Sequence, residues 1–144
     1  MSRLLHIKVS LALVCALALG AAACGNDSST TAPSAPAATA GTDPVTGQMA
    51  PGGVLFHQFV ASAAGAVNIT LTATDPAATL VGLGIGIPGG NVGSCDLTKS
   101  VQTRPGSAAQ LSVLVDAGTF CAGTFDVGGL GTKGVLVTYS VAHP

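Results

Sequence analysis

The stretch VNITLT, residues 67–72, decides the fold class, because apolar and polar residues alternate along it without interruption. Successive side chains of a β-strand point to opposite faces of the sheet, so this period of two places Val67, Ile69 and Leu71 on one face. The other face is polar. The pattern predicts a strand of an antiparallel sheet with one face in the core and one face in water.

Similar runs surround this stretch at short intervals, and none of them has helical spacing. The predicted strands are 54–61, 66–74, 79–87, 94–101, 108–115, 119–127 and 134–142, of which 94–101 is the weakest. The residues between them are rich in Gly, Pro, Asp and Asn, which supply the φ angles that tight turns need. We therefore predict one all-β domain over residues 53–144, an antiparallel β-sandwich of about seven or eight strands.

The beginning of the chain is typical of a secretory signal peptide. Arg3 and Lys8 provide positive charge, the largely apolar stretch 9–19 follows, and small residues occupy 20–23. Eleven residues of helix rise about 16 Å, roughly half of the bilayer core, so a transmembrane anchor is the weaker interpretation. We predict that residues 1–23 are removed during export.

The stretch LGAAAC, residues 19–24, resembles the lipobox of bacterial lipoproteins. In that family the cysteine becomes the mature N-terminus and carries diacylglycerol, which implies membrane anchoring through Cys24, because two or more acyl chains bind stably. Ala21 departs from the leucine that the family favours, and the small residues also suit ordinary signal cleavage without lipid. Gly25 is not the aspartate that retains such proteins in the inner membrane, so we expect the outer membrane.

Cysteine counting agrees with this interpretation. Cys15 lies within the signal peptide, and lipid on Cys24 would leave Cys95 and Cys121 as a pair. A disulfide that closes their separation of 26 residues would stabilise the fold by about 3.5 kcal/mol. A two-thiol metal or redox site would need a closer spacing and histidines nearby. We predict a Cys95–Cys121 disulfide.

Residues 24–52 consist mainly of Ser, Thr, Ala, Pro and Gly. Such a segment buries too little apolar surface to offset its ordering entropy, so we predict a disordered tether that ends where the domain begins, at residue 53.

Charge is sparse: three basic residues follow Cys24, against six aspartates, and Glu is absent from the sequence. Without a basic cluster, nucleic acid is not an expected partner. The lack of Trp and the single Tyr disfavour a carbohydrate-stacking surface. We expect a monomer that binds no cofactor. Its expected contacts are the membrane, through the lipid on Cys24, and an envelope protein as a candidate partner.

The run 81–87 is unusual, because Gly82, Gly84 and Gly86 leave one face of the strand bare. These glycines are a weak candidate for a flat binding groove. Close packing of a neighbouring segment, or an aromatic ring lying across the glycines, is the interpretation that we favour.

No catalytic residue can be nominated. His57 and His143 look like isolated surface histidines, and no Gly-x-Ser-x-Gly motif accompanies them. The aspartates of the domain fall at or near turns, where Asp commonly bonds to local backbone. Asp126 is a weak candidate calcium ligand, which we interpret as a structural turn residue.

Several segments resemble the bacterial pre-peptidase C-terminal domain and uncharacterised secreted lipoproteins of similar fold. They are GAVNITLT (65–72), VGLGIG (81–86), Phe120-Cys121, FDVG (125–128) and VTYSV (137–141). The resemblance implies a jelly-roll sandwich that serves as an accessory module for secretion, surface attachment or substrate contact. Some relatives bind calcium through an acidic cluster that is not recognisable here. We expect a non-catalytic envelope lipoprotein, with a calcium-stabilised accessory domain or a small hydrolase as alternatives.

Overall fold

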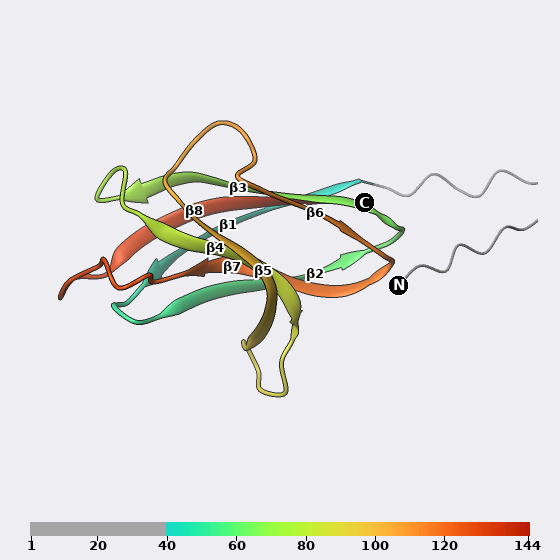
Figure 1. Ribbon diagram of the computed structural model, residues 1–144, viewed down its shortest axis with the longest axis horizontal. Helices are drawn as coiled ribbons and strands as arrows, with labels where there is room; N and C mark the ends of the chain where they lie inside the picture. Colours follow the sequence, from blue (N-terminus) through green and yellow to red (C-terminus); the bar gives the residue numbers. More distant parts are fainter. Residues whose placement is uncertain (1–39) are drawn as a thin grey trace, which may run out of the picture. The chain divides into compact units, whose positions relative to one another are not determined.

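The computed structural model describes residues 40–144, which form eight antiparallel strands in two four-stranded sheets (Figure 1). The strands are β1 (Gly41–Met49), β2 (Val54–Ala61), β3 (Gly65–Asp75), β4 (Val81–Pro88), β5 (Cys95–Thr103), β6 (Leu111–Val115), β7 (Gly118–Phe125) and β8 (Val135–His143). The predicted all-β sandwich is confirmed, and the structure adds β1 to the seven strands expected from the sequence.

The strand order is that of a jelly roll. One sheet runs β1-β8-β3-β6 and the other runs β2-β7-β4-β5. The first strand thus pairs with the last, the second with the seventh, the third with the sixth, and the fourth with the fifth. The four strand pairs form one long antiparallel ribbon that is rolled up, so that two of the pairs lie in each sheet.

The prediction of a disordered tether up to residue 52 is wrong for residues 41–49, which form β1. This strand pairs with β8 along its whole length, from Gly41 opposite His143 to Met49 opposite Val135. Val45 packs against the core and Met49 is buried within it. Pro44 is tolerated because β1 is an edge strand, where a missing N–H can face solvent. The sandwich therefore begins at residue 41 and not at residue 53.

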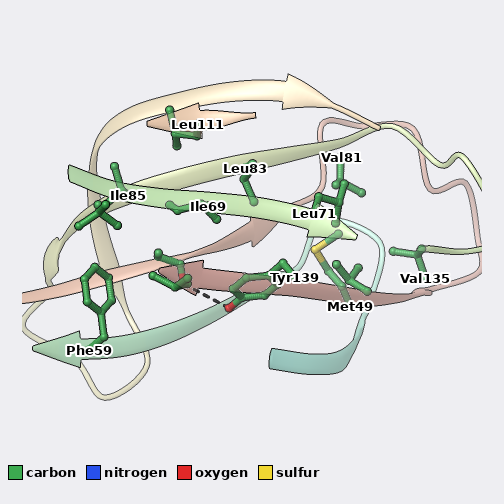
Figure 2. Close-up of a cluster of buried hydrophobic side chains, with 14 of the residues drawn as sticks. Met49, Phe59, Ile69, Leu71, Val81, Leu83, Ile85, Leu111, Val135 and Tyr139 are labelled. Carbon is green, nitrogen blue, oxygen red and sulfur yellow. Dashed lines mark hydrogen bonds between the residues drawn. The ribbon is translucent and has the colours of Figure 1, made fainter. Parts of the chain in front are cut away.

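The core lies between the sheets and consists of the residues at every second position of the strands (Figure 2). Val67, Ile69 and Leu71 are fully buried in β3, as their alternation predicts. Tyr139 of β8 lies at the centre, and its hydroxyl shares its one proton between the carbonyl oxygens of Leu55 and Ala122, each 3.2 Å away. Burial raises the pKa of Tyr139 well above its ordinary value, so the hydroxyl remains a neutral donor that joins the two sheets.

A side chain extends the short strand β6. The amide of Gln110 accepts from Leu71 N over 2.8 Å and donates to Leu71 O over 3.2 Å. These two bonds imitate the pairing that one more strand residue would make with β3. The backbone N–H and C=O groups of Leu71 are thereby hydrogen bonded just before β6 begins.

Candidate functional site

The structure confirms the predicted disulfide. Cys95, at the start of β5, is bonded to Cys121 of β7, with their Cα atoms 5.9 Å apart. Because β4 lies between β7 and β5 in the sheet, the bond passes across β4. Cys24 and the predicted signal peptide, residues 1–23, lie outside the described residues.

Gly82, Gly84 and Gly86 are all buried under parts of the same chain. A Cβ atom on Gly82 would meet the ring of Phe125, and one on Gly84 would lie 2.9 Å from the side chain of Leu97.

Gly86 is the most constrained of the three. A Cβ atom on Gly86 would collide with the carbonyl group of Asp96, because the start of β5 passes directly over this position. The three glycines therefore leave space for the ring of Phe125, the side chain of Leu97 and the backbone of Asp96. They do not form the floor of an open groove.

Asp126 acts as a turn residue. Its Oδ1 atom accepts hydrogen bonds from Gly128 N at 2.8 Å and Gly129 N at 3.1 Å, and its Oδ2 atom accepts from Gly52 N at 2.8 Å. The bond from Gly52, together with the other backbone donors, lowers the pKa of Asp126. The carboxylate thus connects the turn before β2 to the loop after β7. Within residues 40–144, no three His, Cys, Asp or Glu side chains form a metal-binding group.

The interpretation of the two histidines as isolated residues is wrong, because both face Asp43 of β1. His57 Nε2 of β2 donates to Asp43 Oδ2 over 2.9 Å, which connects the two sheets at one side of the sandwich. His143 Nε2 of β8 lies 3.5 Å from the same oxygen atom, too far for a strong hydrogen bond. We call Asp43, His57 and His143 the histidine–aspartate cluster.

The ring of His143 is held by its neighbours. It packs against Phe59 of β2 with the ring centroids 5.1 Å apart, and it covers Gly41, where a Cβ atom would lie 2.6 Å from the ring. Its two ring nitrogens are buried without a hydrogen-bond partner among the described residues. The imidazole of His57, by contrast, is 37% exposed.

The cluster has the first two parts of a nucleophile-activating system. The hydrogen bond from His57 lowers the pKa of Asp43, so this carboxylate stays ionised and orients the ring of His57. The third part would be a hydroxyl or thiol, and among residues 40–144 none is hydrogen bonded to either histidine. The geometry assigns no reaction to these groups.

Sequence reasoning missed this cluster because Asp43 falls in the segment that was predicted to be disordered. The inward positions of β1 include only two apolar side chains, Val45 and Met49, so the sequence carries no local signal that would have placed Asp43 on a strand.

An apolar hollow of about 270 Å³ opens between the sheets on the side away from the cluster. Ile85 and Ile87 of β4, Val113 and Val115 of β6, and Phe120 of β7 form its apolar wall. Thr98 and Asp116 add polar groups to the lining. The hollow can accept one or two apolar side chains.

Comparisons with known proteins identify no relative: no family model, no curated protein and no solved structure matches the chain. Among residues 40–144, no helix is both long and apolar enough to cross a membrane.

Proposed function

We propose that this chain is an exported, lipid-anchored protein of the bacterial cell envelope, which presents its sandwich as a non-catalytic accessory module. The observation that supports the proposal most is the Cys95–Cys121 disulfide. Disulfides form and persist in oxidising compartments outside the cytosol, so the bond suits a protein that has passed the inner membrane. Export in turn agrees with the signal-like segment 1–23 and with the lipobox-like stretch that ends at Cys24.

The accessory role rests on the chemistry of the described residues. Within residues 40–144, no nucleophile is hydrogen bonded to the histidine–aspartate cluster, and Asp126 already accepts hydrogen bonds from three backbone N–H groups. The strand pattern that resembles pre-peptidase C-terminal domains supports the same role, since those domains assist attachment or secretion. We expect an envelope protein as partner and the outer membrane as location.

The lipid anchor is tested by labelling bacteria that express the full chain with an alkyne-tagged fatty acid. We expect label on the mature protein, a mass that includes an acylated Cys24, and loss of label in Cys24→Ser. Cys15→Ser is the matched control, because it removes the other cysteine of the N-terminal region and should leave the labelling intact. An unlabelled mature protein would refute the anchor.

A further inference from the structure

The strand β6 has an open edge. It is the last strand of its sheet, and only five residues long. The Ile69 carbonyl of β3 accepts a hydrogen bond from Gln110 N, so Ile69 and every second residue from it direct their backbone groups toward β6. Their partners in β6, which include Val113, direct their own groups back toward β3. The backbone groups of Ser112 and Leu114 therefore face the open edge.

The ammonium group of Lys99 covers part of this edge. Lys99 Nζ of β5 donates to Ser112 O over 3.2 Å, across the side of the sandwich. Lysine at a strand edge hinders pairing with another strand, but a side-chain cap on a flexible stem is displaced more easily than a packed loop. Once an incoming strand displaces it from Ser112 O, the Lys99 ammonium group could donate a hydrogen bond to another oxygen atom.

The surroundings of the edge are apolar. Leu114 is 83% exposed and Ile87 is 52% exposed, although both residues line the hollow between the sheets. An open strand edge beside an apolar hollow is the arrangement by which proteins add a strand from a partner: backbone hydrogen bonds hold the strand, and the hollow accepts its side chains.

We propose that the occupant is β6 of a second copy of this chain, paired antiparallel about a two-fold axis at Val113. Ser112 of each copy would then lie opposite Leu114 of the other, and the two residues would exchange N–H···O bonds, about four in all. This departs from the monomer expected from the sequence, and it does not depend on the proposed lipid anchor.

Charge complementarity favours a second copy over an unrelated strand. Lys99 lies near one end of β6 and Asp116 immediately follows the other end. Antiparallel pairing brings the two ends together, so each displaced Lys99 faces Asp116 of the opposite copy. The edge is thus complementary to itself in backbone hydrogen bonding and in charge. A five-residue edge is a small interface, so the association should be weak and best detected by covalent trapping.

Val113→Cys provides the trap. Opposed residues of a pair without direct hydrogen bonds have Cα atoms about 4.5 Å apart, within the range that a disulfide spans. We expect the full chain carrying V113C to form a disulfide-linked dimer on a non-reducing gel. On the same gel, the wild-type chain and T72C, which changes an exposed position of β3, should run as monomers because they place no cysteine at the pairing axis. Protease resistance and circular dichroism verify that each variant is folded.

Charge reversal tests the register. In the V113C background, K99D and D116K should each reduce the dimer several-fold, because each places like charges together at both ends of the pairing. Mixing the two variants should restore the dimer, since each reversed charge then faces an opposite one. The proposal would be overturned if folded V113C formed no dimer, or if neither K99D nor D116K changed the amount of dimer.

If V113C does not fold, a second trap replaces it. Chains carrying S112C and L114C, which alter exposed side chains alone, are expressed together and should be linked to each other. Absence of that linkage in folded protein would overturn the proposal equally.

Discussion

At the scale of single residues, Gly86 shows how closely the chain passes over itself. Its missing side chain leaves space for the carbonyl group of Asp96, which belongs to the backbone and cannot rotate away. We therefore expect Gly86→Ala to lower the free energy of unfolding by about 1–3 kcal/mol, the usual cost of overpacking. Gly90→Ala is the matched control, because no atom lies within 4 Å of its Cβ position. Chemical denaturation measures both, and equal stabilities would contradict the close approach.

Asp43 predicts an acid-sensitive contribution to stability. The hydrogen bond from His57 holds the pKa of Asp43 below its ordinary value of 3.8. A carboxyl group with a lowered pKa in the folded state contributes stability above its unfolded pKa, and this contribution disappears as the pH falls through the folded value. We expect Asp43→Asn to flatten the decline in unfolding free energy below about pH 4. Asp75→Asn, at the exposed end of β3, should retain the wild-type slope; an unchanged slope in D43N would argue against the bond.

At the scale of elements, β1 is the strand that sequence reasoning failed to find, and its residues explain why. Its inward positions include Gly41, Asp43 and Gly47, which do not produce an apolar alternation. The strand forms because its backbone pairs with β8 and because two inward residues, Val45 and Met49, reach the core. Since that pairing partner lies at the other end of the sequence, a local pattern could not reveal it.

Two deletions test whether residues 41–49 belong to the folded domain or to the predicted tether. Removing residues 41–49 exposes the edge of β8 and removes the packing of Met49, so we expect the domain to lose its cooperative thermal transition. Removing residues 30–38, a segment of equal length within the predicted tether, should leave Tm unchanged. Calorimetry of the two proteins tests the boundary at residue 41, and an unaltered Tm in the first deletion would count against it.

At the scale of the whole molecule, the disulfide acts mainly on the unfolded chain. Cross-linking Cys95 and Cys121 restricts a loop of 26 residues and so reduces the entropy gained on unfolding. We expect the double variant C95A/C121A to be less stable than the wild type by about 3.5 kcal/mol on the chain-entropy estimate. Reduced wild-type protein should show a similar loss in urea denaturation. A difference below about 0.5 kcal/mol, the usual range for surface substitutions, would contradict this role.

Seven strands were predictable because the alternation of apolar and polar residues is a local signal. The disulfide was predictable because the count of cysteines leaves Cys95 and Cys121 as a pair. Local patterns indicate neither the pairing of particular strands nor the histidine–aspartate cluster, since both depend on which distant strands meet. Asp43, His57 and His143 come from three strands and two sheets, and their contact follows from the rolled topology. No pattern near any one of them indicates the other two.

The pairing of the first strand with the last has a consequence for the timing of folding. Gly41 pairs with His143, so nearly the whole domain must be available before the β1–β8 pair can form. A fold with such high contact order forms slowly compared with a helical bundle. If the chain is exported as proposed, its sandwich cannot close during translocation while the C-terminal strand is still inside. Under that proposal, the β1–β8 pairing would keep the sandwich open until the last strand has crossed the membrane, and a pore that accepts only extended polypeptide would require this.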